Sequence, residues 1–546
     1  EIAQCLVGSE MCIRDRVIVA VFIILTFINK HKLDKILLMA STMIYGSAAI
    51  IQDNKFYFSI GACIIMGAVT VYCVGDWLRF KLKKLPTIAI IAILGILFTL
   101  CTGLLTSFKY LQHWAPCYDF GIFSQMFNYM KETLQPLTTC ERDGLLSHFA
   151  VHFSPIYYLL LPFFFIFPSP VTLLIGQAAI IASGLIPLYL ICKRHKLSNA
   201  AVILFSLCYV LFPSMANGCF FFLHENKFLT PLILWLAFAL EKNKWIPSVI
   251  FTLLLLAVKE DAPVYAAVLG LYFIVSRRNI SKGALVFVLS IIYFITVSYF
   301  MSKYGLGTMS YRYDNFIYDG SGSLFTVIKA VILNPIYTVH EAFDEEKIKF
   351  ILQMLVPLAF MPLMIKKPSR IILLIPFILL NLMSDYTYQH NINFQYTYGS
   401  AAFLFYLMIL NYQDMKPGFR CKVLAVAATS SIFMFMCNTY YRTSGYESYK
   451  TDKNNGAIDI IDDALELVPD DSSVAATTFL VASLYDHREV YEFESTNHRD
   501  EVEYIVLDLR ISSDDFSVDD YLNNPIYETV ENKPGYIAIF RNTTVE

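Results

Sequence analysis

The chain has 546 residues, of which 56 % are hydrophobic and only 16 % are charged, and its mean hydropathy is +0.54. This composition argues against a water-soluble protein and predicts a polytopic membrane protein. The net charge of −3 says little about partners. Because no basic stripe carries interleaved aromatic residues, we expect no nucleic-acid partner.

The first sixteen residues are set apart from the rest. The stretch Cys5–Arg16 (CLVGSEMCIRDR) looks like a translated sequencing adapter, so we predict that 1–16 is non-native and exclude it from the fold. The native chain is expected to begin near Val17, with a partial apolar run at 17–28.

Apolar runs of helical length follow one another through most of the chain. The predicted spans are 36–51, 56–75, 86–106, 170–191, 198–216, 228–240, 246–258, 262–276, 283–301, 349–365, 370–384, 398–411 and 421–437. This pattern predicts a mainly α fold, a transmembrane helix bundle with about thirteen or fourteen spans if each run crosses once. We expect 17–85 to add N-terminal membrane helices to a membrane domain at 86–441.

Lysine and arginine fall at every second connection between these runs. The basic connections are NKHKLDK, RFKLKK, KRHK, EKNK, SRRNISK, KKPSR and KPGFRCK, and the positive-inside rule assigns them to the cytoplasm. The alternate connections then face outward: 52–55, the long loop 107–155, 224–227, 259–261, 302–348 and 385–398. The proline-bearing segment 155–168 fits this alternation only as a re-entrant or interfacial element.

Residues 442–546 are polar and acidic and contain no further run long enough to span. Helical periodicity at AIDIIDDALELV, strand patterns at SSVAATT, REVYEF, EYIVLDL and GYIAIF, and a second helix at DDFSVDDYL predict a small α/β domain. A terminal hairpin is expected to turn at Lys533-Pro534-Gly535. The alternation of sides makes this domain extracytoplasmic.

The outer loop 107–155 is the longest polar interruption in the first half of the chain. Asp119 could act as a general base or metal ligand there, or simply cap the helix that follows it. His148 and His152 would share one helical face and could hold a divalent metal, although two ligands are too few by themselves and both could equally be hydrogen-bonded structural histidines. Cys117 and Cys140 flank the loop and could form a disulfide if that side is oxidising.

Two other outward connections carry ionisable residues beside aromatic ones. One holds His224 and Glu225, and the other holds Lys259, Glu260 and Asp261. Single polar residues at loop tips are usually just solvated, so the prediction of a site depends on these loops meeting the outer loop in space. The tyrosine-rich segment 310–322 could stack on a sugar, although interfacial tyrosine belts are the commoner explanation.

Several catalytic motifs are missing from the sequence. There is no Walker A loop, no G-x-G-x-x-G after a strand and no G-x-S-x-G elbow. We therefore expect no nucleotide cofactor and no ATP hydrolysis by this chain.

A set of short motifs resembles one known family. D-F-G-I-F-S-Q (119–125), H-F-S-P (152–155), P-L-Y (187–189), L-F-P (211–213), H-E (224–225) and K-E-D (259–261), with V-P-D-D-S-S-V-A-A-T and V-Y-E-F in the tail, resemble the prokaryotic domain-of-unknown-function family 2079. That family is similar to the GT-C superfamily of membrane glycosyltransferases, which use polyprenyl-phosphate sugars.

The resemblance implies a GT-C-like fold, a multi-pass location in the prokaryotic cytoplasmic membrane, and a polyprenyl-phosphate sugar donor with a glycan, lipid or protein acceptor. Asp119 would take the place of the essential acid in the first large outer loop. Arg142 or Lys259 would neutralise the leaving phosphate. The remaining polar residues, His224, Glu225, Glu260 and Asp261, would bind substrate, and His148 and His152 would hold any divalent metal.

Two other functions remain open at this point. A transporter or flippase of a lipid-linked or polar solute would carry ionisable residues within its helices and show broken repeats. A non-catalytic membrane assembly protein would need neither feature.

Overall fold

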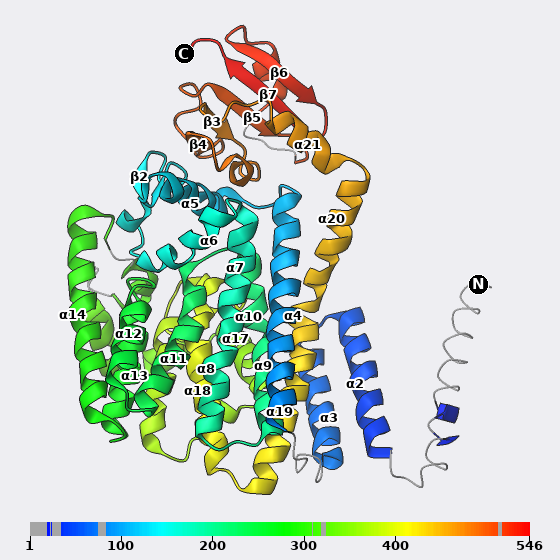
Figure 1. Cartoon of the computed structure of the whole chain (residues 1–546), viewed down its shortest axis with the longest axis vertical. Helices are drawn as coiled ribbons and strands as arrows, with labels where there is room; N and C mark the ends of the chain where they lie inside the picture. The colour runs from blue at the N-terminus through cyan, green and yellow to red at the C-terminus, as the bar shows by residue number, and fades with distance from the viewer. Residues whose placement is uncertain are drawn as a thin grey trace.

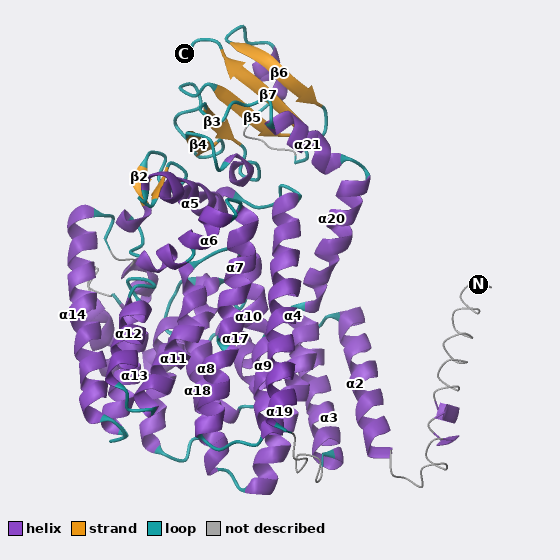
Figure 2. Cartoon of the chain, in the orientation of Figure 1, coloured by secondary structure: helices purple, strands orange, loops and turns teal. Residues whose placement is uncertain are grey.

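The computed structural model describes residues 34–74, 83–307, 310–317, 324–511 and 516–545, and, nearer the N-terminus, 19–21, 23 and 24. The adapter-like segment 1–16 and most of the partial run 17–28 lie outside the described residues. Helices stand side by side in a bundle, and a separate domain lies over one end of it (Figure 1). The strands belong to that domain and to a small pair beside it (Figure 2).

The bundle contains helices of very different lengths. In chain order they are α2 (Asp34–Asp53), α3 (Phe56–Cys73), α4 (Lys84–Leu111), α7 (Pro170–Ser183), α8 (Leu185–Arg194), α9 (Asn199–Val210), α10 (Pro213–Asn217), α11 (Leu229–Glu241), α12 (Trp245–Leu256), α13 (Ala262–Val275), α14 (Ile280–Tyr304), α15 (Leu324–Leu333), α16 (Pro335–Ala342), α17 (Glu345–Leu355), α18 (Tyr398–Asp414) and α19 (Pro417–Asn438).

The chain is a mainly α membrane bundle, as predicted, but it has fewer full-length spans than runs. Among the described residues, six helices are long and apolar enough to cross a membrane, with α7 and α8 counted as one span, and a seventh is obtained if α9 and the bent segment Pro213–Phe221 are joined. Prolines break other runs: after α17, Pro357 and Pro362 lie in short 3₁₀ turns, and Ala359 and Phe360 adopt positive φ. Such irregular backbone is tolerated within a bilayer where protein surrounds it.

Close packing inside the bundle depends on small residues at helix contacts. Gly270 of α13 and Gly283 of α14 face each other so closely that a Cβ added to either would lie 2.7 Å from the carbonyl oxygen of the other. Small residues let membrane helices approach in this way. These two helices border the amphipathic cavity described below.

The basic connections gather at one end of the bundle, as the alternation predicts. Glu241 at the end of α11 pairs with Arg194 (3.2 Å) and Arg278 (3.6 Å), and Asp414 at the end of α18 pairs with Arg370 (2.6 Å). The loop from α18 to α19 lies at the end opposite the C-terminal domain (Figure 1). The bundle therefore has a cationic end and an end that carries the outer loop and the domain.

The segment between α4 and α7 covers the domain end without crossing the bundle. It consists of α5 (Ile122–Thr133), a two-residue strand pair β1 (Leu137–Thr138) and β2 (Leu146–Ser147), the 3₁₀ turn Pro155–Leu159, and the six-residue helix α6 (Leu161–Ile166). The region 155–168 is too broken to span, as its prolines predict.

The C-terminal domain is a small α/β unit. Helices α20 (Ser444–Asn454), α21 (Ala457–Leu465) and α22 (Val518–Leu522) accompany a sheet of β3 (Ser473–Ala476), β4 (Glu489–Glu492), β5 (Tyr504–Asp508), β6 (Tyr527–Lys533) and β7 (Ile537–Asn542), in the order β4-β3-β5-β7-β6. β3 is parallel to β4 and β5, whereas β7 is antiparallel to β5 and β6. The predicted strands and the terminal hairpin are all present.

Polar contacts fasten this domain to the outer loop. The Arg510 guanidinium donates to the carbonyls of Gln112 (2.7 Å) and His113 (2.6 Å). On the other side of the loop, the Asp143 carboxylate accepts from the backbone (2.9 Å) and side-chain amide (3.0 Å) of Asn497. The domain thus holds the loop that carries Asp119 from both sides.

Candidate active site

Strained backbone positions Asp119 where the outer loop turns into α5. Asp119 has φ 66° and ψ −59°, a γ-turn conformation that is rare and strained. Facing it, Phe222 has φ 59° and ψ −164°, a region that normally requires glycine, and its ring stacks on Phe120 at 4.8 Å. Strain of about 1–3 kcal/mol per residue tends to collect at functional sites. Two strained residues in neighbouring segments, Asp119 and Phe222, mark this region as a candidate site.

His224 is the partner of Asp119. Its Nε2 lies 3.4 Å from the Asp119 carboxylate, and the imidazole is 4 % exposed whereas the carboxylate is 31 % exposed. The imidazole ring stacks on Phe221 and meets the edge of Phe123. The histidine is therefore fixed between aromatic rings, and Asp119 presents its carboxylate to the open side.

Glu225, the next residue, forms a buried ion pair with Lys259. The Lys259 ammonium donates to one Glu225 oxygen at 2.6 Å, and both side chains are at most 4 % exposed. The other oxygen accepts from the Tyr157 hydroxyl at 2.6 Å, and that hydroxyl accepts from the Glu225 backbone N–H at 2.9 Å. A buried charge is tolerated only when it is paired and hydrogen-bonded, and every polar atom of the Glu225 side chain meets this condition.

The charges in this cluster keep its carboxylates ionised. Burial acts to raise the pKa of Asp119, but His224 and Lys259 outweigh it and hold that pKa below its usual range. Burial opposes ionisation of Glu225 too, yet Lys259 holds the Glu225 pKa well below normal, and Glu225 in turn raises the pKa of Lys259 against the effect of burial. Burial lowers the pKa of His224, so at neutral pH Asp119 faces a neutral imidazole.

The two predicted metal histidines each turn toward a carboxylate. His152 Nδ1 lies 2.8 Å from Glu260, and His148 Nδ1 lies 2.8 Å from Glu141. Their ring centroids are 5.9 Å apart. Asp119, His224, Glu225 and Lys259 together form the Asp119 cluster. Because Lys259 and Glu260 are consecutive, Glu260 and its partner His152 lie beside this cluster.

The donor set does not match a divalent cation. In the part of the chain that the structure describes, no three histidine, cysteine or carboxylate side chains gather as a metal site would need. Each histidine has its Nδ1 committed to a different acid. Metal binding by His148 and His152 stays a prediction, and no chemical step below depends on it.

A cavity of about 390 Å³ opens from the same loop into the bundle. Most of its lining is apolar and comes from α13, α14 and the segment 375–380, while Lys259, Glu260, Asp261 and Arg312 form its polar end. The Arg312 guanidinium lies over the rings of Tyr386 and Tyr396, at 4.8 and 5.1 Å. The cavity is therefore amphipathic, with two cations and two carboxyl groups at one end and hydrocarbon-like walls along the rest.

Asp261 is the unusual acid of this group. Its Oδ1 is buried and has no hydrogen-bond partner among the described residues. Burial raises the pKa of Asp261 to about 6. This carboxyl group therefore changes charge near neutral pH at the polar end of the cavity.

The structure brings most of the predicted residues together, with one exception and two additions. Arg142 is exposed, and its guanidinium donates to the Glu141 carbonyl at 2.8 Å rather than to the cluster; its binding role stays a prediction. Arg312 and Tyr157 were not among the predicted site residues. Arg312 is the one arginine in the tyrosine-rich segment 310–322, a signal that could have singled it out, whereas nothing in the sequence distinguishes Tyr157 from its neighbour Tyr158.

The disulfide that Cys117 and Cys140 could form is absent, although the two thiols are neighbours. Both cysteines are free, and Cys117 is buried against the C-terminal domain beside Cys140. Cys140 directs its thiol to the Val490 carbonyl at 3.2 Å.

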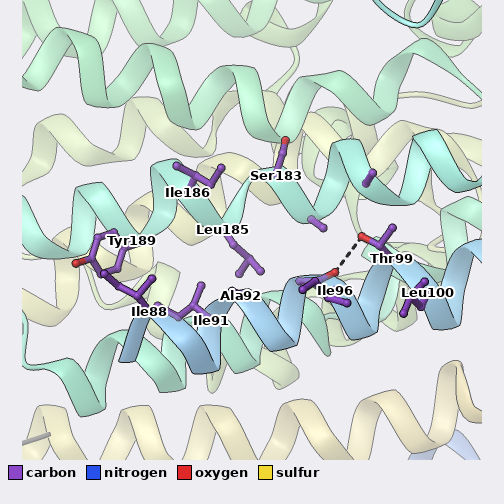
Figure 3. A pocket seen from close by; sticks show the side chains of 13 residues that line it. Ile88, Ile91, Ala92, Ile96, Thr99, Leu100, Ser183, Leu185, Ile186 and Tyr189 are labelled. Atoms are coloured by element: carbon purple, nitrogen blue, oxygen red, sulfur yellow. Dashed lines mark hydrogen bonds between the residues drawn. The ribbon is translucent and has the colours of Figure 1, made fainter. Parts of the chain in front are cut away.

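A larger hollow lies elsewhere and has a different character. The groove has a volume of about 520 Å³ and lies between α4 and the α7–α8 span. Figure 3 shows side chains that line it. Its walls are side chains such as Ile88, Ile96 and Ile186, and among the described residues that line it only Tyr189 carries an ionisable group. Because its lining is almost entirely apolar, the groove does not offer the side chains that an active site needs. In a membrane protein an apolar surface hollow is ordinarily filled by lipid chains.

Comparison with known proteins identifies the family to which the chain belongs. A solved structure, that of ArnT from Cupriavidus metallidurans bound to undecaprenyl phosphate, matches 82 % of this chain and 97 % of its own length, with 11 % sequence identity and a TM-score of 0.44. No curated protein matches in sequence. The family described as predicted membrane protein DUF2079 matches residues 112–537, which include the outer loop, the site and almost all of the C-terminal domain. The chain belongs to the DUF2079 family of membrane proteins.

Proposed function

We propose that this protein is a membrane glycosyltransferase that moves a sugar from a polyprenyl-phosphate donor to an acceptor on the extracytoplasmic side. The observation that supports it is a part-exposed, ionised Asp119 that interacts with Lys259, which lines the polar end of an amphipathic cavity together with Arg312. A polyprenyl-phosphate sugar, like the cavity, has an apolar part and a charged part, since its isoprenoid chain is apolar and its head group is anionic.

Asp119 acts as the general base. It is the most exposed ionised group of the cluster, and it is held in place by a strained turn and by His224. Its carboxylate accepts the proton of an acceptor hydroxyl as that oxygen attacks the anomeric carbon. The bond from the anomeric carbon to the phosphate oxygen breaks, and its electron pair leaves with the polyprenyl phosphate. The proton passes from Asp119 to solvent, which restores the base.

Arg312 and Lys259 stabilise the charge that develops on the leaving phosphate. Both line the polar end of the cavity, and cations fixed where charge develops lower the barrier most when water is excluded. The charge of Lys259 is already shared with Glu225. Arg312, with a planar guanidinium that suits a phosphate, carries the larger part of this role.

The orientation follows from the two ends of the bundle. The end with the clustered Arg194, Arg278 and Arg370 faces the cytoplasm under the positive-inside rule. The outer loop, the site and the C-terminal domain then face outward from the prokaryotic cytoplasmic membrane, where lipid-linked donors are used.

The test is release of polyprenyl phosphate from a panel of labelled undecaprenyl-phosphate sugars by the full chain in nanodiscs. Loss of a general base lowers rates by about 10²–10⁴-fold, so Asp119→Asn should fall by at least about a hundredfold, while Asp53→Asn, at an exposed outer turn, keeps the wild-type rate. Full release by Asp119→Asn, or no release by the wild type from any donor in an extract that contains the native acceptors, contradicts the proposal.

A further inference from the structure

A second polar cavity, of about 210 Å³, lies away from the Asp119 cluster. Carboxamides dominate its walls and come from five separate segments: Asn54 between α2 and α3, Asn217 of α10, Gln353 of α17, Asn393, and Asn438 at the end of α19. The rings of Phe56 and Tyr441 and the ammonium of Lys349 line it as well. The cavity lies beside the junction of the N-terminal hairpin with the bundle.

One of these amides is both fully buried and incompletely used. Asn217 is 0 % exposed, and its Nδ2 donates to the Asn438 carbonyl at 2.8 Å. Its Oδ1 accepts no hydrogen bond from any described residue, and the same is true of the buried Asn393 Oδ1. A buried carbonyl oxygen without a partner costs about 1–3 kcal/mol, so two of them in one cavity indicate a ligand that donates hydrogen bonds.

Hydrogen bonds fix the side-chain amides of three other lining residues, Gln353, Asn438 and Asn393. Gln353 Nε2 donates to Asn438 Oδ1 at 2.9 Å, and Asn438 Nδ2 donates to the Met434 carbonyl at 2.8 Å. Asn393 Nδ2 donates to Asn391 Oδ1 at 3.1 Å. This network fixes the directions of these side chains, and among the described residues that line the cavity two buried oxygens, of Asn217 and Asn393, remain without a donor.

The lining also excludes several classes of ligand. Among the described residues that line the cavity there is no carboxylate, so a metal cation would find no charge partner. A hydrocarbon chain would leave the amides unsatisfied. The volume lies below the roughly 300 Å³ at which pockets for drug-sized ligands begin, which restricts the occupant to about one small ring.

We propose that this cavity is a saccharide-binding site that takes a single hydroxyl-rich glycosyl ring. Hydroxyl groups donate and accept hydrogen bonds, as carboxamides do, so a sugar ring matches a cavity whose walls are mostly amides. The Phe56 and Tyr441 rings offer apolar faces to the C–H face of the sugar. The ring belongs to a free glycan or to a glycolipid head group, which share this chemistry.

The site is separate from the Asp119 cluster but adjoins its wall. Asn393 precedes Phe394, whose ring meets Phe221 at 4.4 Å, and Phe221 stacks on His224. An aromatic partition thus divides the amide-lined cavity from the imidazole that contacts Asp119. The saccharide site extends beyond the proposed transfer reaction, and binding there does not require Asp119.

The experiment measures binding of methyl glycosides of glucose, mannose, galactose and N-acetylglucosamine to the full chain by saturation-transfer NMR. Phosphatidylcholine nanodiscs replace alkyl-glycoside detergents, because those carry sugars themselves. Octyl glycosides of the sugars that bind then distinguish a glycolipid from a free glycan, since only a glycolipid site favours the lipid-bearing form. Adenosine and glycerol 3-phosphate serve as ring and polar-head comparators.

The key variant is Asn54→Gly, because Asn54 has φ 41°, which glycine adopts without strain. Loss of the hydrogen bonds that the Asn54 amide makes to the glycoside should raise the glycoside Kd about five- to tenfold. The matched control is Asn243→Gly, another asparagine with positive φ (55°), which lies at the opposite end of the bundle, near Arg194 and Arg278. Tyr441→Leu, at an exposed position, gives a second measurement if Asn54→Gly fails to fold.

The outcomes separate this site from the proposed active site. The inference is supported if a glycoside binds, if Asn54→Gly or Tyr441→Leu weakens it, and if Asn243→Gly and Asp119→Asn do not. It is overturned if no glycoside binds, if adenosine or glycerol 3-phosphate binds better, or if binding is lost in Asp119→Asn and kept in both cavity variants. Sugar transfer abolished by Asp119→Asn with glycoside binding intact leaves both proposals standing.

Discussion

The Glu225–Lys259 pair provides a direct test of whether the site is shielded from water. Removing one partner of a buried ion pair leaves an uncompensated charge and costs about 3–5 kcal/mol. The pair is 2.6 Å long, and both side chains are at most 4 % exposed, so Glu225→Gln and Lys259→Met should each cost an amount in this range. The double variant leaves neither charge unpaired, and the amide oxygen introduced by Glu225→Gln can still accept from Tyr157. We therefore expect it to be less destabilised than either single variant.

The assay is unfolding of the full chain in mixed micelles of increasing SDS content, followed by tryptophan fluorescence. The double-mutant cycle should yield a coupling energy of about 3 kcal/mol, near the upper limit for residues in direct contact. Single variants that each cost less than about 1 kcal/mol, with additive effects, would match a solvated surface pair. That result would refute the claim that the cluster is a water-excluded site.

The pH dependence of the pair follows from its two pKa shifts. Glu225 has a folded-state pKa well below its unfolded value of 4.5, so its contribution is complete above 4.5 and is lost as the pH falls through the folded value. Lys259 has a folded-state pKa above its unfolded value of 10.5, so its contribution is complete below 10.5 and is lost only above that. The stability that the pair itself contributes should therefore stay constant between these limits.

Two further predictions concern two other carboxylates, Asp261 at the cavity and Asp143 at the C-terminal domain. Asp261 is an acid whose folded-state pKa is raised to about 6 from 3.8, so its ionisation costs stability as the pH rises from about 4 to 6. In thermal unfolding, Asp261→Asn should therefore stabilise the chain more at about pH 8 than at about pH 4. An equal effect at both pH values would contradict the burial of this group. Asp143→Ala removes the acceptor of the Thr496 hydroxyl and of both Asn497 donors, so limited proteolysis should release residues 442–546 several-fold faster, whereas Asp520→Ala, at an exposed position of the same domain, should not change the rate.

The sequence by itself determined the class of protein and the two ends of the bundle. Hydropathy is a local property, and the energy of placing Lys or Arg on one side of a membrane is local as well. For this reason the alternation of basic loops correctly placed Arg194, Arg278 and Arg370 at one end. The strands and the hairpin of the C-terminal domain also follow local patterns of alternation and turn residues.

The number of crossings depended on more than hydropathy. The runs 349–365 and 370–384 are apolar enough to suggest spans, but the first ends in turns at Pro357 and Pro362, and the second is formed by 3₁₀ and π-helical segments. Burial inside the bundle allows such backbone, and burial is a property of the packed structure that an apolar run does not reveal.

The candidate site shows the same division. Chemistry and the alternation of sides suggested that Asp119, His224 and the loop at 259–261 face outward together. Only the tertiary structure decided that Lys259 pairs with Glu225, thirty-four positions away, that His152 pairs with Glu260, and that Arg312 rather than Arg142 lines the cavity. Partners of this kind are chosen by how helices pack side by side, because packing sets which loops meet and which charges are removed from water together.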